Sequence, residues 1–155
     1  MALRKPLVLD SGQIEQIQAG DILDAAVTEI DIVSATNKEV GDITIGMPVY
    51  LFEADQVKKA KADAAGTARV LGLVRAASIA ADASGYIQTD GVLASADWTA
   101  VIGSTTLTAG SVYYLSAATG GQLTTTAPTT GYIVEVGQAI STTELELSQR
   151  SPIKL

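Results

Sequence analysis

Apolar and polar positions alternate in short runs along most of this chain, a pattern typical of half-buried β-strands. The clearest unit spans residues 110–141. There Val112–Leu115 is rich in β-branched and aromatic residues, which favour an extended strand. The residues of Ala118–Gly121 favour a turn, and the extended pattern resumes from Tyr132 to Val136. The chain is therefore predicted to turn back on itself in this region.

A weaker copy of this unit lies upstream. Gly46–Leu51 aligns with Gly110–Leu115 at an offset of 64 and keeps the glycine, the second tyrosine and the leucine. With one residue inserted, the glycines of the following strands, Gly72 and Gly137, also align. Two copies are fewer than a solenoid needs. Two interpretations remain open: an internal duplication with related halves at about residues 43–76 and 107–141, or a chance match of two hairpins.

Further strands are predicted on both sides of these units. The segments that read as strands are Leu7–Leu9 with Gln13–Gln18 as a hairpin, about Ala26 to Ala35, Ala68–Ala76, and Glu144–Leu147 with acid outside and leucine inside. Glu53–Ala65 alone has a helix-forming composition, although the repeat alignment would make it a hairpin arm. The whole pattern predicts an all-β fold, a small β-barrel or β-sandwich with little helix.

The length of 155 residues is that of one ordinary domain. Pro6 cannot donate a hydrogen bond to a sheet and pushes the residue before it into an extended conformation. We therefore expect an extended N-terminal arm over residues 1–10 and a single β-domain over residues 11–155.

The distribution of charge excludes several classes of function. The net charge is −7, and no lysine or arginine occurs between Ala76 and Gln149. A nucleic-acid groove needs clustered basic residues, so no nucleic-acid partner is expected. The chain has no cysteine and no histidine, which excludes disulfides, cysteine-ligated zinc and catalytic triads that use imidazole. No apolar run approaches the ~20 residues of a membrane span, so we expect a soluble protein made in the cytoplasm that binds no membrane.

Three spaced carboxylates provide the only candidates for catalysis in the second half. Asp82, Asp90 and Asp97 would have to converge to act as a glycosidase-like pair. Each lies beside alanine, serine or glycine in a turn, where aspartate commonly caps backbone amides. A calcium site at Asp82 lacks the spacing of the known loop motif. We therefore expect no enzyme activity, no catalytic residues, no cofactor and no metal.

Two parts of the chain resemble proteins of tailed-phage virions. The opening Lys5–Asp24, KPLVLDSGQIEQIQAGDILD, is similar to the formula that begins many capsid-surface and tail-fibre proteins. The second half is similar to a module of head-decoration, head-fibre and tail-fibre proteins. The matching stretches are Gly85–Ile87, Asp90–Leu93, Trp98, Leu107, Gly110, Tyr113–Ser116, Gly120, Leu123–Thr124, Pro128, Gly131, Val136–Ser141 and Pro152–Leu155. Together these stretches cover most of the chain.

The resemblance implies a capsid decoration, or cement, protein on the outer surface of the phage head, which stabilises the shell against the pressure of packaged DNA. Its partner would be the major capsid protein, and its implied assembly is a homotrimer. Tail fibres normally continue into a long shaft or tip, so the size of the chain favours decoration. The alternative is an adhesin module of a tail fibre or head fibre that binds a host receptor or glycan.

The resemblance also suggests contact residues. Arg4, Lys5, Pro6 and Leu7 of the arm are candidates for contact with the coat protein, with a solvated tail as the alternative. Trp98 and Tyr113 are candidates for a subunit interface, where aromatic residues are enriched. A core role suits Trp98 at least as well, and Tyr113, with Tyr50 and Tyr114, is expected to pack the barrel rather than to form a platform for sugars. A third candidate is the lysine group Lys58, Lys59 and Lys61, which would face the shell unless it belongs to a solvated loop.

Overall fold

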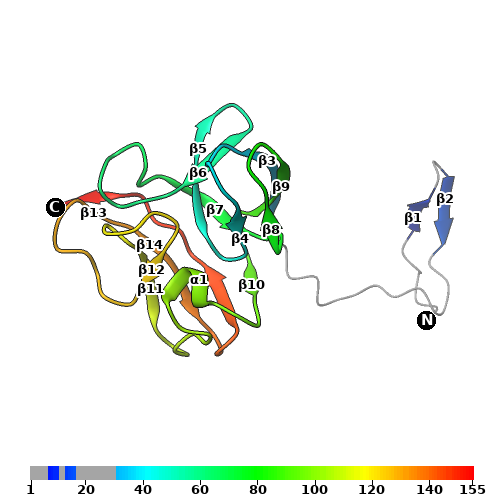
Figure 1. The fold of residues 1–155 in the computed structure, drawn as a ribbon. Coiled ribbons are helices and arrows are strands. Elements are labelled where there is room, and N and C mark those ends of the chain that lie inside the picture. Colours follow the sequence, from blue (N-terminus) through cyan, green and yellow to red (C-terminus); the bar gives the residue numbers. More distant parts are fainter. Residues whose placement is uncertain (1–6, 11–12, 17–30) are drawn as a thin grey trace.

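A computed structural model describes residues 31–155 and the backbone of residues 7–10 and 13–16 (Figure 1). The regular secondary structure of the described part is nearly all strand, which confirms the predicted all-β class, and the first half of this part is a closed β-barrel. The barrel strands, in chain order, are β3 (Ile32–Asn37), β5 (Pro48–Glu53), β6 (Gln56–Lys59), β7 (Val70–Val74) and β9 (Ser84–Gln88).

A second sheet of five strands follows. Its members are β10 (Val92–Ala94), β11 (Val112–Leu115), β12 (Leu123–Thr124), β14 (Glu135–Ala139) and β15 (Glu144–Leu147). Smaller pairs are β1 (Leu7–Asp10) with β2 (Gln13–Gln16), β4 (Ile43–Thr44) with β8 (Ser78–Ile79), and β13 (Tyr132–Ile133) with β16 (Ile153–Lys154). The one helix of the described residues is the single turn α1 (Thr99–Ile102).

The barrel and the second sheet share one plan. The order β6-β5-β7-β9-β3 in the barrel corresponds to β12-β11-β14-β15-β10 in the second sheet. Val49 pairs with Gly72 as Tyr113 pairs with Gly137, and the register shifts at the next residue in both cases. The correspondence also includes β3, β9, β10 and β15, which lie outside the ranges aligned by sequence.

The glycines that open the two units have the same role. Gly46 and Gly110 have φ angles of 82° and 80°, in the left-handed region that glycine enters without steric cost. Each donates its backbone N–H across the sheet, Gly46 to Val74 O at 2.8 Å and Gly110 to Ala139 O at 2.7 Å. The chain therefore enters β5 and β11 in the same way.

The two sheets differ in how they are closed. β3 and β6 pair in parallel and complete the barrel, whereas their counterparts β10 and β12 do not pair with each other. The chain after β10 forms α1 instead, which lies beside β12 (Figure 1). Trp98, just before α1, is fully buried, and its indole N–H donates to Thr143 O at 3.2 Å. A packed helical turn thus lies beside β12, the end strand of the second sheet.

Two hydrophobic cores hold the described body together. One fills the barrel and contains only residues of the first half, such as Val49, Val57 and Ile87. The other combines Ala60, Ala62, Ala68 and Leu73 of the first half with a larger set from the second: Leu93, Trp98, Val101, Leu107, Tyr113, Leu115, Leu123, Val134, Val136, Ala139, Leu145 and Leu147. Because this second core draws on both halves, the barrel and the second sheet are packed as one unit.

Some predicted elements differ from the observed ones. The helical composition of Glu53–Ala65 is overridden, because Val57 is buried in the barrel as part of β6, and residues 54–55 form a turn between β5 and β6. The strand expected from Ala26 begins at Ile32, and residues 26–30 lie outside the described part. The predicted hairpin near the N-terminus is present as β1 and β2, so the arm boundary placed at residue 10 would divide a hairpin.

Candidate functional site

An open groove lies where the two halves of the described body meet. Its volume is about 520 Å³, within the range of ligand pockets. One wall comes from the chain leading into β7, and the other from Tyr132 and the segment after β15. The lining residues are Ala65, Arg69, Val70, Tyr132, Gln149, Arg150, Ser151 and Pro152. Grooves at such junctions are frequent binding sites because two elements contribute polar groups to one place.

Two arginines give this groove its electrostatic character. Arg69 is exposed and has no ion pair within the described part of the chain. The Nε of Arg150 lies 3.1 Å from Glu135 Oε2, and 72% of the Arg150 side chain remains exposed. Glu135 therefore holds Arg150 from one side and leaves its terminal nitrogens for another acceptor. A guanidinium presents donors in a planar fork that matches a carboxylate.

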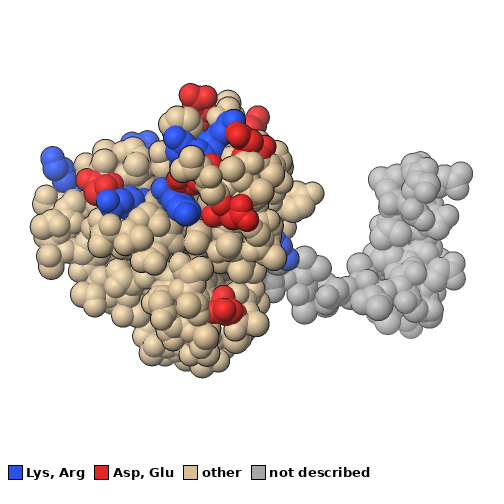
Figure 2. All heavy atoms as spheres, viewed as in Figure 1, with Lys and Arg blue, Asp and Glu red and all other residues tan. Residues whose placement is uncertain are grey.

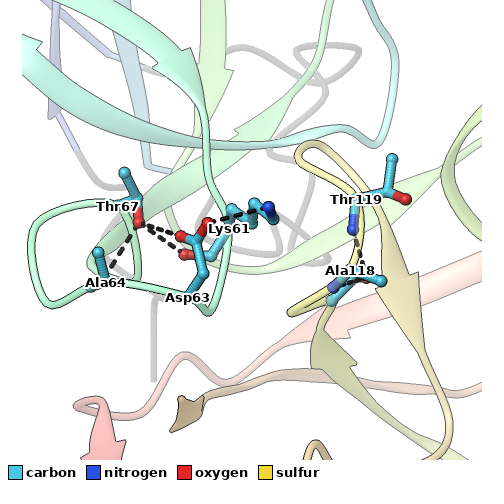
Figure 3. Close-up of polar contacts among 7 residues, drawn as sticks. Lys61, Asp63, Ala64, Thr67, Ala118 and Thr119 are labelled. Atoms are coloured by element: carbon cyan, nitrogen blue, oxygen red, sulfur yellow. Dashed lines mark hydrogen bonds and ion pairs between the residues drawn. The ribbon is translucent and has the colours of Figure 1, made fainter. Parts of the chain in front are cut away.

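Residues 61–67 form a loop that leads into the first wall of the groove, and hydrogen bonds within the loop hold it in place (Figure 3). The hydroxyl of Thr67 lies 2.9 Å from both Lys61 O and Asp63 Oδ1 and 3.1 Å from Ala64 O. Lys61 Nζ and Asp63 Oδ2 form an ion pair of 2.9 Å. The hydrogen bond from Lys61, with a smaller one from Thr67, lowers the pKa of Asp63 below its ordinary value of 3.8 despite some desolvation.

The second wall is fixed by backbone pairing. The N–H of Arg150 donates to Glu135 O at 3.0 Å, and that of Leu155 donates to Gly131 O at 3.1 Å. Lys154 is paired with Tyr132 between β16 and β13, so the two side chains leave the sheet on the same face. A third cation therefore lies on the same face as Tyr132, a residue of the groove.

The candidate contact residues of the arm fall mostly outside the described residues. Arg4, Lys5 and Pro6 are among the undescribed positions, and Leu7 is the first residue of β1, described by its backbone alone.

Trp98 and Tyr113 require a correction. They are 0% and 2% exposed within the single chain, so their side chains belong to the core and cannot reach a second subunit. The phenol oxygen of Tyr113 accepts a hydrogen bond of 2.9 Å from the N–H of Thr108, which satisfies its polar end inside the fold.

The three lysines expected to face a shell are each engaged within the chain. Lys58 Nζ lies 3.8 Å from the centre of the Phe52 ring, and Lys61 pairs with Asp63. The stem of Lys59 lies against Gly121, and the N–H of that glycine donates to Ala60 O at 2.9 Å. These contacts give each lysine a different neighbour within the chain.

The three spaced aspartates serve separate turns. Asp82 has a φ of 60° and pairs with Lys38 at 2.6 Å, while Asp90 accepts a bond from Gln88 through its backbone oxygen. Asp97 Oδ1 accepts from the N–H of Thr99 at 2.8 Å, and hydrogen bonding from Thr99, first by its side chain and then by its backbone, lowers the pKa of Asp97. In the described part of the chain, no three metal-ligating side chains gather into a site, and no helix has the length and apolar character to cross a membrane.

A second surface feature is an almost uncharged region. Residues 91–134 include one charged residue, Asp97. In Figure 2 the charged side chains gather over the barrel and the C-terminal strands, whereas the part that holds α1, β11 and β12 is nearly free of them on the face shown. Exposed threonines are the main polar residues of this region, which we call the uncharged face: Thr99, Thr105, Thr106, Thr108, Thr119, Thr125, Thr126, Thr129 and Thr130.

Sequence reasoning did not identify the groove. Arg69 and Arg150 are far apart in the chain and belong to no motif, and only the fold places them on one hollow. The available signal was the charge distribution, because Arg150 and Lys154 are the only basic residues after Arg75.

Comparison with known proteins adds no further identification. No protein-family model matches the chain, and no curated protein is significantly similar to it in sequence.

Proposed function

We propose that this chain is a capsid decoration protein of a tailed phage, which binds the outside of the head shell and stabilises it mechanically. Two features support this function. The opening segment and the second half resemble phage virion proteins, and the described body has an all-β architecture. That body is a barrel packed against a second β-sheet, and its three spaced aspartates, Asp82, Asp90 and Asp97, serve separate turns.

The uncharged face is the observation that carries the proposal. A chain with a net charge of −7 keeps one charged residue over residues 91–134, although soluble surfaces are usually about a quarter to a third charged. Depletion of charge is the compositional mark of the buried centre of a protein–protein interface. Charged groups there would lose water without gaining partners, so their absence favours contact with another protein.

Stabilisation of a shell requires no chemistry. Apolar area buried across a junction contributes roughly 25 cal/mol per Å², less the cost of association and of ordering any arm. A decoration protein makes this contact at every equivalent site of the capsid lattice. A modest association free energy for each copy therefore adds up to a large stabilisation of the whole head.

The copy number in purified virions tests the proposal most directly. Decoration predicts an amount of this protein close to that of the major capsid protein, measured by quantitative mass spectrometry. A few dozen copies or fewer in each virion would contradict decoration and favour a fibre adhesin.

A charge placed on the uncharged face tests the contact itself. We expect Thr105→Glu and Thr126→Glu to weaken binding to heads at least about tenfold, since each would bury an unpaired carboxylate. Ser34→Glu on β3 is the matched control, because Ser34 is also exposed but belongs to the barrel. Equal binding by all three variants would place the contact elsewhere.

A further inference from the structure

The groove between the two halves has the properties of a carboxylate-binding site. It concentrates Arg69 and Arg150 in one hollow of a protein that carries seven more negative than positive charges. Arg150 is oriented by Glu135, and Arg69 has no ionic partner among the described residues. Two guanidinium groups held at one groove provide bidentate donors for the carboxylates of a ligand.

The shape of the groove favours an extended peptide over a small compact anion. Its volume of about 520 Å³ exceeds what one carboxylate fills, and it is open to solvent. Tyr132 and Pro152 contribute apolar surface to the lining, and Gln149 and Ser151 contribute polar groups. An acidic peptide matches this lining in two ways: its side-chain carboxylates can bind the arginines, and its aliphatic carbons can pack on the rings of Tyr132 and Pro152.

The walls are ordered before any ligand arrives. Thr67 and the Lys61–Asp63 pair tie the loop that leads to Arg69, as Figure 3 shows. Backbone bonds from Arg150 and Leu155 tie the opposite wall to residues 131–135. Such preorganisation reduces the entropy that binding costs.

The charge of the whole protein argues against a nucleic acid as the occupant. A phosphate backbone needs a row of cations, and at net −7 the protein would repel a long polyanion. A short acidic segment needs two or three cations at one place, and Arg69, Arg150 and the nearby Lys154 provide that number.

From these observations we infer that the groove binds an extended acidic segment of a partner protein through Arg69 and Arg150. The partner would be the coat protein, an identification that rests on the proposed function. The groove would then be a second contact that adjoins the uncharged face at Tyr132 and selects the partner by charge.

The test uses the full chain and a fluorescently labelled hexaglutamate peptide, with binding followed by anisotropy. We expect saturable binding that Arg69→Gln and Arg150→Gln each weaken at least about tenfold, the loss of one charge-assisted contact. Lys38→Gln is the control, because it removes the same charge from an exposed ion pair with Asp82 outside the groove. Hexaglutamine should not bind.

Two outcomes would overturn the inference: equal hexaglutamate binding by Arg69→Gln and Lys38→Gln, or tighter binding of hexathymidylate than of hexaglutamate. Circular dichroism of each variant shows whether it is folded. If Arg150→Gln disturbs the fold by removing the ion pair with Glu135, the test relies on Arg69→Gln.

Cosedimentation with heads separates this inference from the proposed function. If hexaglutamate binds through the arginines but the chain does not bind heads, the groove is a site for acidic peptides and the proposed decoration of capsids is contradicted. If heads bind equally well with Arg69→Gln and Lys38→Gln, decoration stands and the coat-protein segment does not occupy the groove.

Discussion

Gly72 and Gly137 show how closely the two halves correspond at the scale of single residues. A Cβ built on Gly72 would lie 2.3 Å from the backbone oxygen of Gln88, and one on Gly137 would lie 2.3 Å from that of Glu146. Both glycines therefore allow the next strand to approach more closely than any side chain permits.

Alanine at either glycine is expected to destabilise the fold. We predict that Gly72→Ala and Gly137→Ala each lower the free energy of unfolding by about 1–3 kcal/mol, because the new methyl group forces backbone apart. Urea denaturation followed by circular dichroism measures the change. Gly66→Ala is the matched control, since a methyl group there would meet no neighbouring atom within 4 Å and its effect should stay within about 0.5 kcal/mol. A Gly137→Ala protein as stable as that control would show that β15 is not held against β14 as described.

Asp63 links stability to pH. Because its pKa is lowered in the folded state, the carboxylate contributes stability that is fully present above the ordinary value of 3.8. That stability is lost as the pH falls through the lower folded pKa. We predict that wild type exceeds Asp63→Asn in urea resistance at pH 6 and that the two converge as the pH falls below 3.8. In a Lys61→Gln background the gap at pH 6 should shrink, because Lys61 is the largest cause of the shift; an unchanged gap would contradict this cause.

At the scale of elements, the strands were predictable where local pattern and tertiary context agree. Val112–Leu115 and Glu144–Leu147 are strands with the predicted bounds, because their apolar residues face a core on alternate positions. The helical composition of residues 53–65 was misleading, since burial of Val57 in the barrel outweighs the helix preferences of the alanines and lysines around it. The groove could not be predicted, because its two arginines meet only through long-range pairing.

The N-terminal segment is expected to be dispensable for folding. Both described cores consist of residues from Ala35 onwards, and β3 begins at Ile32. We therefore predict that removing residues 1–30, which leaves no half of the β1–β2 hairpin behind, changes the Tm by less than about 5 °C, as expected for a change near 1 kcal/mol.

The same truncation tests the arm as a contact. If residues 1–30 grip the coat protein as the resemblance implies, the truncated chain should fail to cosediment with heads, and a chain lacking only residues 1–3 should still bind. Normal binding by the truncated chain would assign attachment to the body alone.

At the scale of the whole molecule, the mixed core couples the halves. Leu73 of the barrel packs in the same cluster as Leu115 and Leu145 of the second sheet, so neither half can separate without exposing apolar surface. We predict a single thermal transition in which the calorimetric and van't Hoff enthalpies agree. Two resolved transitions, or a stable folded fragment of residues 31–89, would show that the halves are independent.

The edge strands of the second sheet, β10 and β12, affect how copies of the protein behave when they are packed closely together. β10 has three residues and β12 has two, and α1 lies beside β12. Edge strands this short expose few unpaired backbone N–H and C=O groups, so a neighbouring chain can hardly extend the sheet. Many copies can therefore sit side by side at high local density without growing into fibrils.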